Sequence, residues 1–119
     1  MSKYVDGFLI PIPKDKVDEY KKLSQKISEI YKEYGALEYC ECVGDDMNIE
    51  GVISFHKAAK TSVNETVMFA WIVFESKEHR DKVNSLIHKD PRIVEECKTK
   101  PFVDFSKLVY SGFKSMVKF

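Results

Sequence analysis

The longest apolar run of the chain lies within Thr66-Val67-Met68-Phe69-Ala70-Trp71-Ile72-Val73-Phe74-Glu75. Alternate side chains of an extended strand point to opposite faces. Both sets are apolar here, with Val67, Phe69, Trp71 and Val73 on one face and Met68, Ala70, Ile72 and Phe74 on the other. This pattern predicts a central strand covered on both faces. The chain's own helices can cover one face, but 119 residues are too few to supply a second layer.

Two further strands and a helix are predicted in the N-terminal half. Residues Tyr4–Pro13 alternate as a strand, and Asp6 is the one carboxylate among its apolar side chains. The prolines near its end lack the N–H that a ladder needs, so this end should be irregular or at an edge. Residues Lys14–Tyr34 repeat apolar side chains at helical spacing, and Gly35 is suited to end that helix. Residues Ala36–Gly44 are predicted as the second strand.

The C-terminal half is predicted to hold a second helical region and the last strand. Residues Val52–Ala59 favour a short extra strand that forms a hairpin with 66–75, and a short helix is the alternative. Ser76 is a good N-cap for the next helix. At Asp90-Pro91 the chain has a cap and a first-turn proline, so a short helix should start there. Residues Lys107–Val117 are predicted as the final strand.

The order of these elements is that of a split βαβ, or ferredoxin-like, arrangement. We therefore predict a single α+β domain over residues 1–119, with one antiparallel sheet and both helices on one of its faces. The other face would still carry Val, Phe, Tyr and Trp side chains, and an apolar surface of that size usually contacts a partner. The simplest prediction is a homodimer in which two sheets pack face to face. A small ligand or an unrelated protein could cover the face instead.

Composition disfavours several classes of partner, although a local basic patch stays open as an alternative. Lys plus Arg and Asp plus Glu are 19 each, so no overall charge attracts nucleic acid or anionic lipid. The longest apolar run is far too short to span a membrane, and no signal-peptide core is visible near the N-terminus. Three cysteines imply no disulfide framework. We therefore expect a cytoplasmic protein with no nucleic-acid or membrane partner.

Asp6 and His56 are the candidate catalytic residues. A carboxylate within an apolar layer has a raised pKa unless it is paired, and such a group can act as a general base. The alternative for Asp6 is a structural ion pair with Arg80, Arg92 or a lysine. His56 could be a base or a ligand, although a surface position on an edge strand is the commoner situation for a lone histidine.

Four further residues are candidates for a ligand pocket. Trp71 and Tyr110 could line a site for a flat hydrophobic or aromatic molecule, whereas packing in the core or at a dimer interface is the commoner role of such side chains. Arg80 and Arg92 could bind an anionic group, or they could lie solvated on helix surfaces.

No cofactor or metal site is predicted. Cys40-Glu41-Cys42 places two thiols on one strand face, but a structural zinc site usually needs a second matched pair. Free cysteines commonly act as small apolar residues. No Gly-rich phosphate loop, nucleophile elbow or H-E-x-x-H motif is present. Nucleotide-dependent enzymes and metallopeptidases of the familiar kinds are therefore disfavoured.

The chain resembles the YbaA-like family of uncharacterised bacterial proteins almost from end to end. The residues that carry the resemblance are Tyr4-Val5-Asp6-Gly7-Phe8, Tyr34-Gly35-Ala36-Leu37, Glu41-Cys42, Trp71-Ile72, Ser76-Lys77-Glu78, Arg80-Asp81, Asn84, Asp90-Pro91-Arg92, Pro101-Phe102 and Tyr110-Ser111-Gly112-Phe113. The resemblance implies the dimeric α/β barrel superfamily, in which two ferredoxin-like protomers pack their sheets together. That superfamily includes cofactor-independent monooxygenases, isomerases, haem-dependent enzymes and proteins with no known activity. Since the family has no established catalytic motif, no residue role follows from the resemblance.

Two hypotheses of function follow, from different classes. The first is a cofactor-independent enzyme of the monooxygenase or isomerase type, in which Asp6 or His56 is the base, Trp71 and Tyr110 line the pocket and an arginine orients the substrate. The second is a non-catalytic module that binds a metabolite or a protein. RNA binding on an exposed sheet is disfavoured, because the basic and aromatic RNA-binding pattern is missing and the net charge is zero.

Overall fold

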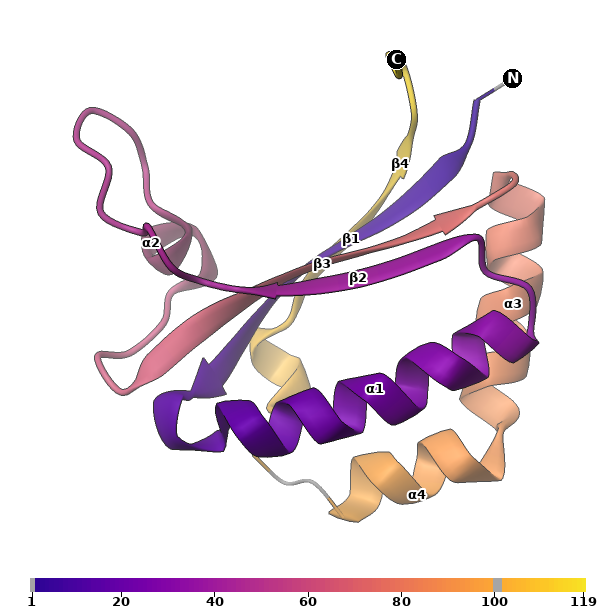
Figure 1. Cartoon of the computed structure of the whole chain (residues 1–119), viewed down its shortest axis with the longest axis horizontal. Coiled ribbons are helices and arrows are strands. Elements are labelled where there is room, and N and C mark those ends of the chain that lie inside the picture. Colours follow the sequence, from indigo (N-terminus) through magenta and orange to yellow (C-terminus); the bar gives the residue numbers. More distant parts are fainter. Residues whose placement is uncertain (1, 100–101) are drawn as a thin grey trace.

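A computed structural model of the chain describes residues 2–99 and 102–119. Its elements, in chain order, are β1 (Tyr4–Pro13), the 3₁₀ turn η1 (Lys14–Lys16), α1 (Val17–Glu33), β2 (Glu38–Val43), α2 (Phe55–Ala59), β3 (Glu65–Phe74), α3 (Lys77–Lys89), α4 (Pro91–Thr99), the 3₁₀ turn η2 (Phe105–Lys107) and β4 (Val109–Lys114) (Figure 1). Pro101, which contributes to the family resemblance, lies outside the described residues.

The strands form one antiparallel sheet in the order β2-β3-β1-β4. This is the ferredoxin-like topology predicted from the sequence. The apolar strand β3 is central and pairs with β1 over ten residue pairs, from Tyr4 opposite Phe74 to Pro13 opposite Glu65. Strand β4 pairs with β1 only as far as Leu9. The proline-bearing end of β1 therefore lies at an edge, as predicted, and needs no N–H donors on that side.

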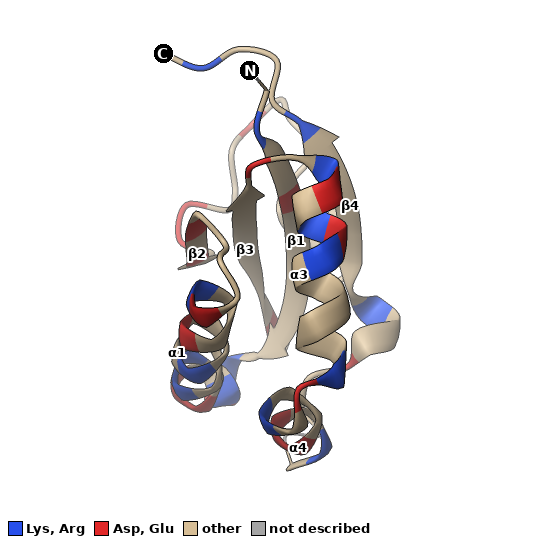
Figure 2. Cartoon of the chain, turned by 90° about the vertical axis from the view of Figure 1, so that its right-hand side faces the viewer, with Lys and Arg blue, Asp and Glu red and all other residues tan. Residues whose placement is uncertain are grey.

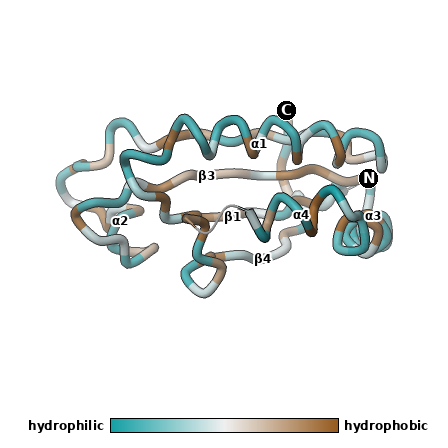
Figure 3. The backbone as a smooth tube through the Cα atoms, turned by 90° about the horizontal axis from the view of Figure 1, so that it is seen from below, coloured by the Kyte–Doolittle hydropathy of each residue, from teal (hydrophilic) through white to brown (hydrophobic). Residues whose placement is uncertain are grey.

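Helices α1, α3 and α4 cover one face of the sheet, which we call the helix face (Figure 1). The buried apolar residues between these layers are Ile12, Tyr20, Leu23, Ile30, Met68, Ile72, Phe74, Val83, Ile87 and Ile93. Those from β3 occupy the even-numbered positions, which confirms the alternation read from the sequence. Charged residues lie mainly on the helices and near the strand ends (Figure 2). Hydrophilic and hydrophobic segments alternate along α1 (Figure 3).

The helix ends follow the predicted signals. Gly35, with a φ of +101°, follows the last turn of α1 in the left-handed region that favours glycine. The Ser76 hydroxyl accepts a hydrogen bond from the His79 N–H at 3.1 Å and caps α3. The carboxylate of Asp90 accepts from the Arg92 N–H at 2.8 Å, where α4 begins at Pro91. None of the helices within residues 2–99 and 102–119 combines the length and apolarity needed to cross a bilayer.

The predicted strand over Val52–Ala59 is wrong, because residues 55–59 form the short helix α2. The Ser54 hydroxyl caps this helix by accepting from the Lys57 N–H at 3.2 Å, and Lys60 ends it with a φ of 55°. These caps outweigh the short apolar alternation that favoured a strand. The final strand is also shorter than predicted, since η2 occupies residues 105–107 and β4 ends at Lys114.

The other face of the sheet, which we call the open face, is covered only at one end. Helix α2 packs there against β1 and β3, where Pro11 and Val67 are fully buried. Beyond α2, large apolar side chains remain accessible, with Phe69 42% and Phe113 57% exposed. The second apolar face predicted for β3 is therefore present, and the described part of one chain leaves most of it without a cover.

Two adjacent positions of α3 test this assignment of the core. Ile87 is 2% exposed and Leu86 is 39% exposed. We expect Ile87→Ala to lower the free energy of unfolding by about 2–5 kcal/mol, because it leaves a hole in a packed core. Leu86→Ala should cost less than about 1 kcal/mol. Urea denaturation of both variants measures the difference, and equal losses would contradict the orientation of α3.

Candidate functional site

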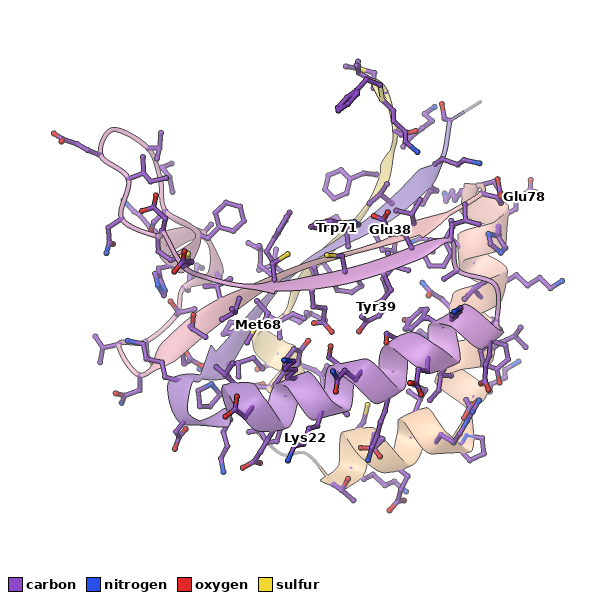
Figure 4. All side chains as sticks on the ribbon, viewed as in Figure 1. Lys22, Glu38, Tyr39, Met68, Trp71 and Glu78 are labelled. Carbon is purple, nitrogen blue, oxygen red and sulfur yellow. The ribbon has the colours of Figure 1, made fainter. Side chains whose placement is uncertain are left out.

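A cavity of about 320 Å³ lies between the helix face of the sheet and helices α1, α3 and α4. Its wall is mainly apolar and contains two aromatic pairs. Phe8 and Tyr110 stack with ring centres 4.9 Å apart, and Tyr31 and Tyr39 lie 5.6 Å apart. In Figure 4, Tyr39 points from β2 toward α1, across the space between sheet and helix. Such a cavity suits a small hydrophobic molecule.

Glu41 is the carboxylate in the cavity wall. Position 41 lies two residues after Tyr39 in β2, so both side chains point to the helix face. One carboxylate oxygen accepts a hydrogen bond from the Tyr20 hydroxyl, and the other accepts from the Tyr39 hydroxyl at 2.7 Å. Burial, together with the Glu41 charge, raises the pKa of both tyrosines. These phenols therefore remain protonated and can donate to the carboxylate at neutral pH.

A second polar group adjoins the cavity and is built around Asp6. Asp6 is 1% exposed, and its carboxylate accepts from Arg80 at 2.8 Å and from the Asn84 amide nitrogen at 3.2 Å. Arg80 also donates to the Tyr110 hydroxyl at 2.7 Å. Asn84 and Tyr110 belong to the cavity wall, whereas Asp6 and Arg80 support them from behind. This is the ion pair predicted as the alternative to a catalytic role for Asp6.

Of the predicted pocket residues, Tyr110 lines the cavity and Trp71 does not. Figure 4 shows Trp71 and Glu38 on the side of the sheet opposite Tyr39, and the Trp71 indole donates to the Glu38 carboxylate. The side chains of odd-numbered β3 residues point to the open face, and Trp71 is one of them. The prediction grouped Trp71 with Tyr110, but the two lie on opposite faces of the sheet.

His56 and Arg92 are also absent from the cavity wall. His56 lies in α2, and its Nδ1 atom is 2.6 Å from the Thr61 hydroxyl. Arg92 lies in α4, and one of its nitrogens bonds the carboxylates of Asp90 at 2.8 Å and Glu33 at 2.7 Å. The structure therefore does not bring Asp6, His56 and Arg92 together in one site.

The thiols of Cys40 and Cys42 share the open face, as predicted, and their sulfurs lie 3.8 Å apart. This separation is a contact between free thiols, since a disulfide bond is about 2.05 Å long. Cys97 lines the cavity, and burial raises the pKa of its thiol. Within residues 2–99 and 102–119, no group of three or more His, Cys, Asp and Glu side chains is placed to hold a metal ion.

Sequence reasoning did not identify Glu41 or Tyr20 as site residues. The alternation of Tyr39 and Glu41 in β2 was a usable signal, because it places both side chains on the face covered by helices. Tyr20 lies on the apolar stripe of α1, where its hydroxyl needs a buried partner. Only the fold reveals that this partner is Glu41, because the two residues lie on different elements.

Comparison with known proteins gives a clear family match. A family model described as "Protein of unknown function (DUF1428)" matches residues 3–104. The chain is 41% identical over 115 residues to the uncharacterized protein YbaA of Escherichia coli K12, and the alignment covers 97% of each chain. The same values hold for the YbaA protein of Shigella flexneri.

Solved structures with the same fold are distant in sequence. One is a Nitrosomonas europaea protein whose name assigns it provisionally to the antibiotic biosynthesis monooxygenases, with 9% identity, a TM-score of 0.61 and coverage of 96% of this chain and 90% of that one. Another is described as a dimeric ferredoxin-like protein from an uncultured marine organism, with 14% identity, a TM-score of 0.61 and coverage of 100% and 92%. A nipsnap family protein of unknown function from Agrobacterium tumefaciens has 16% identity, a TM-score of 0.58 and coverage of 95% and 87%. At these identities the likeness shows the fold alone.

The hydrogen bonds around Asp90 predict a pH dependence of stability. Bonds from Arg92 and from the Tyr34 hydroxyl hold the pKa of Asp90 well below its usual range. An aspartate whose pKa is lowered by folding stabilises the folded state fully at pH values above its unfolded pKa of about 4. This stabilisation is lost as the pH falls from there through the lowered pKa of the folded state. We therefore expect Asp90→Asn to be less stable than the wild type at pH 7 and to approach it as the pH drops below about 4. Urea denaturation between pH 7 and pH 3 measures the difference.

The matched control for this experiment is Asp46→Asn, because Asp46 is exposed in the loop before α2. This variant should follow the wild type at every pH. A constant difference between Asp90→Asn and the wild type across the whole range would show that the charge of Asp90 does not contribute to stability.

Proposed function

The chain belongs to the DUF1428 family of proteins of unknown function, and we propose that it binds a small hydrophobic molecule in the cavity between its sheet and its helices. The observation that carries this proposal is an apolar cavity of about 320 Å³ whose wall contains a carboxylate held by two tyrosine hydroxyls. Ligand sites of small proteins combine such apolar walls with a few placed polar groups. A core built only for stability would fill such a volume with side chains.

If the bound molecule is converted, Glu41 is our candidate for the general base. It lies in the cavity wall, and the two phenols that bind it fix its position. Proton removal by such a carboxylate suits a cofactor-independent isomerase or monooxygenase. Asp6 is one of the two candidates from the sequence, the other being His56, and we propose that it positions Asn84 and Arg80, which donate to its carboxylate. A module that retains its ligand without conversion is the alternative, and the same cavity would serve it.

We further propose that two chains pair through their open faces. The supporting observation is the set of apolar side chains that one chain leaves accessible on this face, including Phe69 and Phe113. Pairing with a second copy would bury the same surface on both partners, as a two-fold interface requires. Two of the solved structures with this fold are described as dimeric ferredoxin-like proteins.

The cavity proposal is tested by filling the cavity. We expect 2-methoxynaphthalene, a flat apolar probe, to bind the wild type with one site per chain in isothermal titration calorimetry. Ala70→Phe should weaken this binding by about tenfold or more, because Ala70 is buried in the cavity wall. Ala58→Phe is the matched control, since Ala58 is exposed on α2. Thermal unfolding of both variants verifies that they fold, and unchanged binding by Ala70→Phe would refute the site.

The pairing proposal is tested by a charge on the open face. Native mass spectrometry of the wild type should show a dimer, and it would also reveal any retained small molecule. We expect Phe69→Lys to give monomers at micromolar concentration, because pairing would bury an unpaired ammonium group. Leu86→Lys, at a position of similar exposure on α3, should remain dimeric. A monomeric wild type, or dimers of Phe69→Lys, would refute pairing through this face.

A further inference from the structure

We infer that the cavity selects neutral aromatic molecules that carry a hydroxyl or amino hydrogen-bond donor, and that it discriminates against carboxylates. This inference rests on the proposed function, since it names the ligand class of the same cavity. It follows from four features of the described wall residues: the unused acceptor positions of Glu41, the absence of lysine and arginine among these residues, the orientation of the Asn84 amide and the aromatic pairs.

Glu41 retains unused acceptor capacity toward the cavity. An ionised carboxylate offers about four lone-pair positions. Each of its oxygens accepts one hydrogen bond from a tyrosine, Oε1 from Tyr20 and Oε2 from Tyr39. Because both tyrosines donate, they fix the carboxylate without neutralising its charge. A ligand hydroxyl or amine could therefore donate to a remaining position on either oxygen.

The wall contains little positive charge to balance that carboxylate. Among the described residues that line the cavity there is no lysine or arginine, and His88, which is exposed, is the one histidine. The nearest arginine in the polar network, Arg80, is bound to Asp6, Asp81 and Tyr110. An anionic ligand would bring a second negative charge beside Glu41 in apolar surroundings, where repulsion is poorly screened.

Asn84 supplies a second acceptor. Its amide nitrogen donates to Oδ2 of Asp6 at 3.2 Å, and this fixes which end of the amide carries the oxygen. The amide oxygen is buried and has no hydrogen-bond partner among the described residues. Buried acceptors are usually satisfied, so a ligand donor that reaches this oxygen would satisfy an acceptor that the described residues leave unpaired. Asp6 therefore acts on the ligand indirectly, as a positioning residue that turns the Asn84 oxygen away from itself.

The aromatic pairs define the shape of the rest of the ligand. The stacked rings of Phe8 and Tyr110 and the tilted pair of Tyr31 and Tyr39 belong to the same wall as Glu41 and Asn84. Aromatic rings pack well against another flat ring in offset or edge-to-face contacts. A planar ring with a donor at its edge matches both the apolar wall and its two acceptors.

The test compares three naphthalenes that differ in one substituent, by titration calorimetry at pH 7. 2-Naphthol is neutral and donates, 2-methoxynaphthalene cannot donate, and 2-naphthoate is anionic. We expect 2-naphthol to bind about tenfold or more tighter than 2-methoxynaphthalene, since hydrogen bonds to charged groups are strong. 2-Naphthoate should bind more weakly than either.

Glu41→Gln identifies the group responsible. In this variant we expect the preference for 2-naphthol over 2-methoxynaphthalene to fall to within about threefold, and 2-naphthoate to gain about tenfold, because the charge is gone while the size is kept. The comparison on the wild type stands without this variant if the variant does not fold. Equal binding of the three probes by the wild type would overturn the inference and leave the cavity proposal intact. Binding of none of them would overturn both.

Discussion

Strands β1 and β3 pair along ten residues each, and both strands are apolar on both faces for most of that length. This ladder fixes the register of the whole sheet, because β2 pairs only with β3 and β4 pairs only with β1. A slip by one residue would turn Asp6 from the helix face to the open face and separate it from Arg80. The buried ion pair of Asp6 and Arg80 therefore depends on this register and also penalises its alternatives, since a buried charge without its partner is costly.

Most of the fold could be predicted from local patterns. The alternation in β3, the helical stripe ending at Gly35, and the caps at Ser76 and Asp90 each identify an element without knowledge of the rest of the chain. The failure at Val52–Ala59 has a local cause too. Eight residues are too few for periodicity to separate a strand from a short helix, and the cap at Ser54 decides between them. The sequence alone could not weigh that single hydrogen bond.

The candidate site was much harder to predict than the fold. Asp6 was noticeable because a carboxylate in an apolar strand breaks a pattern, and it has the ion-pair partner Arg80 that was proposed as one alternative. Glu41 does not stand out in the sequence, because β2 is short and polar as well as apolar residues occur on both of its faces. Its importance arises from Tyr20 on α1 and Tyr39 on β2, which meet it only after the sheet and helix are assembled. The role of Glu41 depends on contacts between separate helices and strands, and these contacts cannot be read from a single sequence.

The cavity and the open face lie on opposite sides of one sheet, and β3 contributes to both. Ala70 and Ile72 line the cavity, while Phe69 faces the other way. Trp71, labelled in Figure 4, shares the side of Phe69. Substitutions at even and odd positions of this strand therefore alter different surfaces. During evolution, a lineage can change the side chains that line the cavity while conserving those on the open face, or the reverse, within the same ten-residue segment. The strand alternation thus lets single mutations alter the two surfaces independently within one stretch of chain.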